Sequence, residues 1–239
     1  APFHYNMPNN RSPYQSWASR LGNIGTGNDE VAQLEGRLLD YARELDNLVA
    51  ERDIENLQAM YGYFIDKGMW NEASALFANN GTYEFGLNGV YVGNQRIREE
   101  LTLMGPEGLE PGMLNNYPML QPIISVAADS RSAKARWRSD VQLSRNGKGM
   151  WGGGVYENEY VNENGIWKIS KLHYYVTFWA DYDKGWTEGL QPMNIQSPVL
   201  PPDLPPTEMY GSQPEVYLFP FHFLHPVTDK PHRGTGAAP

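Results

Sequence analysis

The hydrophobic residues of this chain follow a helical period in its first half and a period of two from about residue 115. Between residues 31 and 67 they lie three and four positions apart, as in amphipathic helices. Later runs near 117–127, 133–144, 150–162 and 166–178 alternate like strands, with Asn, Asp and Gly turns between them. Helices followed by an antiparallel meander predict an α+β fold, with helices packed on one face of a long curved antiparallel sheet.

The helical half is expected to hold several elements. Residues 31–52 predict one helix, and residues 53–67 predict a second helix or its continuation, stopped by Gly68. The elements expected next are a helix at 70–78, a turn at 79–81, a strand at 82–85, a loop or tight hairpin at 86–93 and a helix at 94–103.

Segments of different composition flank this domain. Residues 1–30 are rich in Asn, Gly, Ser and Pro and predict an extended N-terminal arm. Residues 186–239 hold 11 of the 18 prolines, which excludes a helix or a central strand there. We expect one domain at 31–185 and a Pro-rich C-terminal tail that straps its own domain or a neighbouring subunit, because the apolar segment 216–224 needs cover.

Composition narrows the class of partner. The net charge of −9 argues against nucleic acid and against an anionic membrane surface. No run of about 18 apolar residues is present to span a membrane. With no cysteine, Cys-ligated metals and Cys nucleophiles are excluded. The start at Ala1 fits an exported, periplasmic protein that has lost a leader, or a trimmed cytoplasmic one, so the location stays open.

Aromatic residues make up 13% of the chain, with 15 tyrosines. They indicate either a well-packed core or an aromatic-lined pocket for a ring-bearing ligand. The tyrosines that could bind a phenol or donate to a developing oxyanion are Tyr61, Tyr63, Tyr83, Tyr91 and Tyr117. The alternative for each of them is a core or rim residue.

Asp66 is the candidate general base. It ends an apolar helix among tyrosines, where loss of water should raise its pKa towards neutrality. His173 is the candidate proton shuttle, because strict alternation places it on the same strand face as Trp167 and Ile169. The alternatives are an exposed acid for Asp66 and a structural histidine for His173.

The other polar or glycine-rich motifs either allow more than one interpretation or do not predict a site. Arg136 and Arg138 share a strand face that is either solvated, part of an interface, or inside the pocket as an anion-binding wall. The histidines near the C-terminus lie between prolines and do not predict a metal site. Gly152–Gly154 lacks the Lys-Ser/Thr of a phosphate loop and more simply permits a bend or a close approach.

A set of motifs resembles the SnoaL-like branch of the nuclear-transport-factor-2-like superfamily over roughly residues 45–180. They are Tyr63-Phe-Ile-Asp66, Trp70 with Leu76-Phe77, Gly81, Tyr83-Glu-Phe85, Gly89-Val-Tyr-Val-Gly93 before Ile97-Arg98, and Gly165-Ile-Trp167-Lys-Ile169. The superfamily includes scytalone dehydratase, ketosteroid isomerase, polyketide cyclases and diarylpropane lyases. The resemblance implies a cone-shaped fold, chemistry without metal or organic cofactor, and dimers or trimers formed through the outer sheet face.

The resemblance also suggests roles for individual residues. The helix-end aspartate of scytalone dehydratase corresponds to Asp66, and its strand tyrosine to Phe85, with Tyr83 two residues earlier. Many members carry histidine where this chain has Asn115, Asn116 and Tyr117.

We therefore expect a cofactor-independent lyase that dehydrates, or removes formaldehyde from, a small hydroxylated aromatic substrate such as a lignin-derived diarylpropane. The expected catalytic residues are Asp66, His173 and Tyr83, and the expected substrate-binding residues are Tyr61, Tyr63, Phe85, Tyr91, Tyr117 and Arg138. An isomerase or cyclase with the same base, and a non-catalytic ligand-binding module, are the alternatives.

Overall fold

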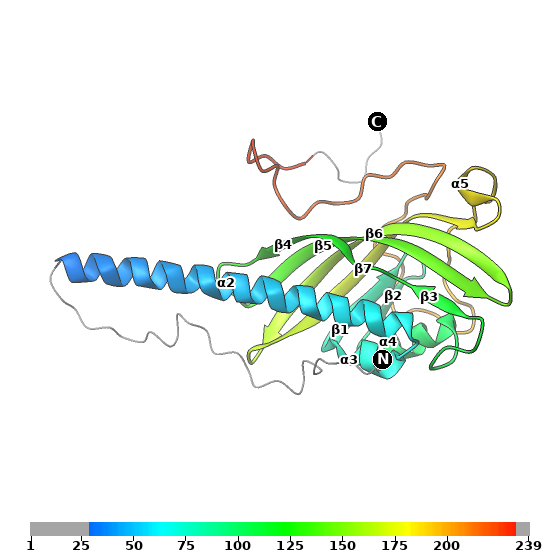
Figure 1. Cartoon of the computed structure of the whole chain (residues 1–239), viewed down its shortest axis with the longest axis horizontal. Helices are drawn as coiled ribbons and strands as arrows, with labels where there is room; N and C mark the ends of the chain where they lie inside the picture. Colours follow the sequence, from blue (N-terminus) through cyan, green and yellow to red (C-terminus); the bar gives the residue numbers. More distant parts are fainter. Residues whose placement is uncertain (1–28, 233–239) are drawn as a thin grey trace.

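A single 38-residue helix, α2 (Asp29–Asp66), opens the computed structural model, which describes residues 29–232 (Figure 1). The two helical patterns at 31–52 and 53–67 are therefore one continuous helix, since no proline interrupts them. Gly68 follows in the left-handed conformation, with φ of 62°, as expected of a helix stop. The arm expected at 1–30 lies, except for its last two residues, outside the described part of the chain.

Seven strands form one curved, unclosed sheet. They are β1 (Phe77–Phe85), β2 (Val90–Val92), β3 (Leu114–Asn116), β4 (Leu120–Val126), β5 (Ser132–Arg145), β6 (Lys148–Glu163) and β7 (Ile166–Asp181). The order is β2-β1-β7-β6-β5-β3, and β4 also pairs with β5. Short helices α3 (Trp70–Ala75), α4 (Asn94–Leu101), η2 (Thr102–Met104) and α5 (Gly185–Glu188) complete the described elements.

The sheet is mixed, although the meander itself is antiparallel as predicted. β1 runs parallel to β7, while the other pairs are antiparallel. The entire meander separates these two strands in sequence, so no hairpin fixes their relative direction. The expected turn at 79–81 lies inside β1, where the register with β7 shifts. β2 falls within the segment predicted as a loop or tight hairpin.

The core lies between the sheet and the second half of α2. Ile54 and Leu57 of the helix are almost fully buried, and the Tyr61 ring meets that of Tyr156 on β6 edge to face. Gln58 accepts hydrogen bonds from Tyr160 and Asn158 on the same strand. This packing fixes α2 across one face of the sheet, while its first half extends beyond the sheet (Figure 1).

The tail covers the other face of the same sheet. Thr207 donates two hydrogen bonds to Glu84 on β1, and the backbone N–H of Val176 on β7 donates to Tyr210 Oη at 2.8 Å. The Arg136 guanidinium on β5 lies 4.1 Å from the centre of the Phe221 ring. In this chain the tail thus contacts its own domain.

Gly154 is required by close packing in the sheet. A Cβ there would lie 2.5 Å from the carbonyl oxygen of Tyr175 and would also meet the Tyr174 ring. We expect Gly154→Ala to lower the free energy of unfolding by about 1–3 kcal/mol, because the strands and the ring must shift. Urea unfolding followed by circular dichroism measures this change.

Gly36 provides the matched control. It lies in α2 with no atom near the position of an added Cβ. Gly36→Ala is expected to stabilise the helix by about 0.5–1 kcal/mol through its better helix propensity. Equal effects of the two substitutions would contradict the packing argument for Gly154.

Candidate active site

An apolar cavity of about 340 Å³ opens between β1, the α4–η2 segment, β5, β6 and the start of the tail. Four aromatic residues and two methionines line it, together with one carboxylate. Its lining includes Tyr83, Phe85, Glu100, Met104, Tyr117 and Trp179. The cavity has the size and lining of a site for a small ring-bearing molecule.

Glu100 supplies the carboxylate. It lies on the buried face of α4 beside Ile97 and Leu101 and is 4% exposed. Its Oε1 accepts a hydrogen bond from Asn88 at 3.1 Å, and its Oε2 is buried without a partner among the described residues. Burial raises the pKa of Glu100 to about 7, against a smaller lowering by Asn88. A carboxyl group with that pKa can take up and release protons near neutrality.

Two tyrosines share the cavity with Glu100. Burial raises the pKa of both Tyr83 and Tyr117, and the negative charge of Glu100 raises each further. Their hydroxyl groups therefore stay protonated at neutral pH and can donate hydrogen bonds to a ligand oxygen. Tyr61 stands behind Tyr83 in the core, hydrogen-bonded to it.

Asp66 lies beside a second, smaller cavity of about 290 Å³, which Tyr63, Asn116 and Tyr117 also line. Its Oδ1 accepts a hydrogen bond from the Tyr117 backbone N–H at 2.7 Å. Partial burial raises the pKa of Asp66, and the Tyr117 bond and Lys67 oppose that rise. Because Tyr117 belongs to both cavities, it separates Asp66 from Glu100.

His173, the candidate proton shuttle, lies beside Glu84 and lines neither of these two cavities. Its Nδ1 lies 3.5 Å from Glu84 Oε2, and its ring stacks on Tyr175 with centroids 3.8 Å apart, on the tail side of the sheet. Burial, with a smaller effect of Lys171, lowers the pKa of His173 to about 3, so it is neutral at physiological pH.

A register shift explains why strict alternation failed for His173. Ile169 pairs with Tyr160 and Lys171 with Glu159, which leaves one extra residue in β7. Such a bulge reverses the side on which the following residues point. Leu172 and Tyr174 therefore join Ile169 in the core, and His173 points to the opposite face.

Arg138 and Tyr91 also lie outside the cavity. Arg138 is exposed on β5, on the opposite face from the buried Trp137, so the alternative that placed it inside the pocket is wrong. Tyr91 is fully buried beneath the tail and donates a hydrogen bond to the Leu200 carbonyl at 2.8 Å. Phe85 is at the cavity wall, stacked on Tyr174 with centroids 4.6 Å apart.

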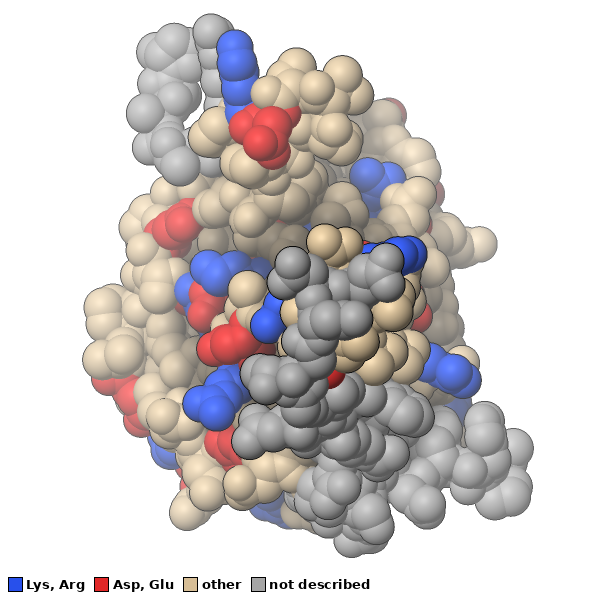
Figure 2. All heavy atoms as spheres, turned by 90° about the vertical axis from the view of Figure 1, so that its left-hand side faces the viewer, with Lys and Arg blue, Asp and Glu red and all other residues tan. Residues whose placement is uncertain are grey.

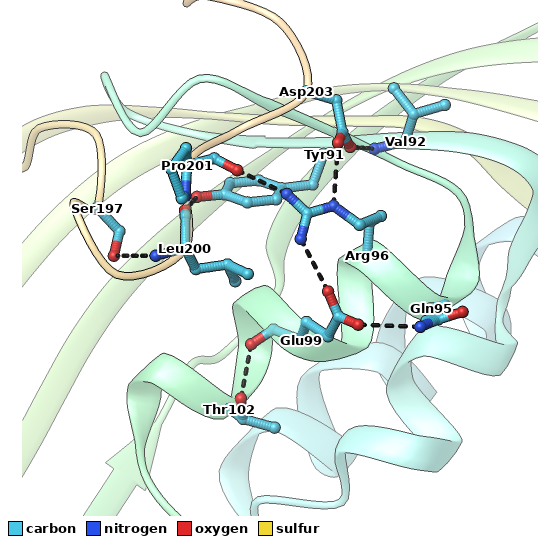
Figure 3. Close-up of polar contacts among 10 residues, drawn as sticks. All are labelled: Tyr91, Val92, Gln95, Arg96, Glu99, Thr102, Ser197, Leu200, Pro201 and Asp203. Carbon is cyan, nitrogen blue, oxygen red and sulfur yellow. Dashed lines mark hydrogen bonds and ion pairs between the residues drawn. The ribbon is translucent and has the colours of Figure 1, made fainter.

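The start of the tail closes one side of the cavity, an arrangement that the sequence did not indicate. Asp203 accepts hydrogen bonds from the Val92 N–H and from Arg96 Nε, and Arg96 also pairs with Glu99 at 2.8 Å (Figure 3). The two hydrogen bonds to Asp203 fix the tail on β2 and α4. Upstream of them, Gln191, Pro192 and Asn194 line the cavity itself.

Residues 29–232 hold neither a metal-binding cluster nor a membrane-spanning helix. No cluster of three or more His, Cys, Asp or Glu side chains is arranged to hold a metal ion in this range. His222 instead pairs through Nδ1 with Glu157 at 2.8 Å. Within the same residues, no helix has the length and apolarity needed to cross a membrane.

Residues 46–173, more than half of the 239-residue chain, match the SnoaL-like domain. The chain belongs to the SnoaL-like family. A putative scytalone dehydratase from Novosphingobium aromaticivorans DSM 12444 is similar in structure, with 21% identity over 57% of this chain and 90% of that chain and a TM-score of 0.50. Hexachlorocyclohexane dehydrochlorinase LinA-type3 from Novosphingobium barchaimii LL02 shares 17% identity over 58% of this chain and 93% of that chain, also with a TM-score of 0.50. At these identities the likeness shows the fold alone, and no curated protein matches the sequence.

Proposed function

We propose that this SnoaL-like protein is a cofactor-independent lyase that eliminates water from a small hydroxylated aromatic compound. The observation that carries the proposal is the Oε2 of Glu100, which has no partner among residues 29–232 and lies inside an aromatic cavity. A buried carboxylate with a pKa of about 7 is a stronger base than an ordinary carboxylate. A large fraction of it is still ionised at neutral pH and can accept a proton.

The cavity residues supply each part of an elimination. Glu100 takes a proton from the carbon next to the one that bears the hydroxyl group, and the electron pair of that C–H bond forms the new double bond. The leaving hydroxyl accepts a hydrogen bond from Tyr83 or Tyr117 and then receives the proton held by Glu100, which gives water. Phe85 and Trp179 offer flat apolar surface to the substrate ring.

Asp66 remains the competing base, as the sequence and the scytalone dehydratase resemblance suggest. It is less buried than Glu100, and its Oδ1 is occupied by the Tyr117 N–H. Loss of formaldehyde from a diarylpropane is the alternative elimination, and it would use Glu100 as the base in the same way. Isomerisation or cyclisation would also use it, and would release no second molecule.

Product analysis on a panel of phenolic hydroxy compounds tests the proposal. Mass spectrometry should detect loss of water with the wild-type protein, with Asp66→Asn still active and Glu100→Gln inactive. The opposite pattern would make Asp66 the base. An isomeric product would indicate an isomerase, and binding without turnover, followed by tryptophan fluorescence, would indicate a ligand-binding module.

A further inference from the structure

α2 carries a second apolar face in its first half. Six residues are spaced alternately three and four apart, as the a and d positions of a heptad repeat. They are Val31, Leu34, Leu38, Tyr41, Leu45 and Leu48, called here the seam. All six are exposed, and three of them strongly, with Leu34 at 61%, Tyr41 at 58% and Leu48 at 62% of their surface.

The seam points away from the protein's own core. Nine residues are two and a half helical turns, so Leu45 and Ile54 lie on opposite sides of α2, as do Leu48 and Leu57. Ile54 and Leu57 are buried against the sheet, with 0% and 1% exposure. Since the first half of the helix also extends beyond the sheet, the seam cannot pack on this domain (Figure 1).

We propose that the seam binds the seam of a second copy of this chain, with the two helices antiparallel. In one register Leu38 packs beside Tyr41 of the second copy and Leu34 beside its Leu45. Val31 and Leu48 form the outermost layer of the same register. All six positions find an apolar partner, and the arrangement is two-fold symmetric and self-limiting.

The charges beside the seam favour this orientation. Arg37 and Glu44 both occupy g positions, which face each other in an antiparallel pair, so two Arg37–Glu44 ion pairs form across the dimer. A parallel pair would instead bring Arg37 against Ala42 and Glu44 against Val49. Basic and acidic side chains are interspersed on the end of the molecule from which α2 projects (Figure 2).

The seam spans 18 residues, which is short for an isolated coiled coil. Here the helix is already ordered, because its second half packs against the sheet. The antiparallel arrangement also places the two domains at opposite ends of the helix pair. Because the helix is already ordered, we expect the seam to form a dimer, and because the seam is short, we expect that dimer to dissociate on dilution.

Sedimentation equilibrium of the full chain tests the seam. The wild-type protein should dimerise, and the double variant Leu38→Glu, Leu45→Glu should raise the dissociation constant at least about 100-fold, because charges enter the four inner layers of the six. Gln33→Glu adds a charge to an exposed position of the same helix outside the seam and should leave the constant unchanged. A wild-type monomer at about 100 μM, or a dimer unaffected by the double variant, would overturn the proposal and leave the seam to residues 1–28 or to another protein.

Disulfide trapping tests the orientation, since the chain has no cysteine of its own. Leu34→Cys protein mixed with Leu45→Cys protein should form a cross-linked heterodimer. Leu34→Cys alone should not cross-link, because an antiparallel pair separates the two copies of that position by 11 residues, or about 16 Å along the helix. Cross-linking of Leu34→Cys with itself, without the heterodimer, would show a parallel pair and refute the proposed arrangement.

Discussion

Replacing Glu100 by glutamine should lower kcat/KM by about 10²–10⁴-fold with the fold retained. Glutamine keeps the size of the side chain and can still accept the hydrogen bond from Asn88. It cannot take a proton from the substrate, so the chemical step fails while binding changes little. Steady-state kinetics on a compound that the wild-type protein dehydrates gives the ratio, and the loss should appear in kcat with KM nearly unchanged.

The pH dependence of kcat/KM gives a sharper signature of the same group. With Glu100 as the base, the wild-type activity rises with pH through an apparent pKa near 7, because only the ionised carboxylate accepts a proton. Glu99→Gln is the matched control: it changes the neighbouring glutamate, whose partners are Arg96 and Gln95 outside the cavity. If Glu100→Gln were as active as Glu99→Gln, Glu100 would not be the catalytic base.

The strands of the meander were predicted from sequence to within a few residues, because alternation and Asn-Gly turns are local signals. β5, β6 and β7 begin and end close to the expected 133–144, 150–162 and 166–178. The parallel pairing of β1 with β7 was missed, because it joins segments about 90 residues apart and depends on how the sheet curves. Local spacing carries no information on such a contact.

Some of the candidate site residues named from the sequence meet in one cavity. Tyr83, Phe85 and Tyr117 all line it, and their roles toward a substrate stay a prediction. Glu100 was missed although the sequence held a signal: it lies three residues after Ile97, one before Leu101, on the apolar face of its helix.

His173 and the cavity wall formed by the tail show where sequence reasoning ends. A one-residue bulge in β7 moved His173 to the other face, and a bulge leaves no reliable mark in the hydrophobic pattern. Composition predicted that the tail crosses a surface, but it could not say that Asn194 would lie in the cavity. That placement depends on tertiary contacts such as Asp203 with Arg96.

The stability of the protein should also report the state of Glu100. Its pKa is raised from 4.5 to about 7 in the folded state, so between these pH values the folded protein holds a proton that the unfolded chain has released. The free energy of unfolding therefore falls as pH rises through this window, by about 3 kcal/mol at 1.36 kcal/mol per pKa unit. Glu100→Gln removes this loss and should be the more stable protein at pH 8.

The contribution of Glu100 is isolated by the difference in free energy of unfolding between wild type and Glu100→Gln, measured as a function of pH. His173 acts in the opposite direction: its pKa is lowered to about 3, so the unfolded chain binds more protons below pH 6.5 and stability rises with pH from about 3 to 6.5. That contribution is common to wild type and variant and cancels in the comparison. Urea unfolding at pH 4 and pH 8 should show the stability advantage of Glu100→Gln growing by about 3 kcal/mol. If the difference in free energy of unfolding between Glu100→Gln and wild type did not change with pH, Glu100 would have an ordinary pKa. That result would contradict both its burial and its role as a base near neutrality.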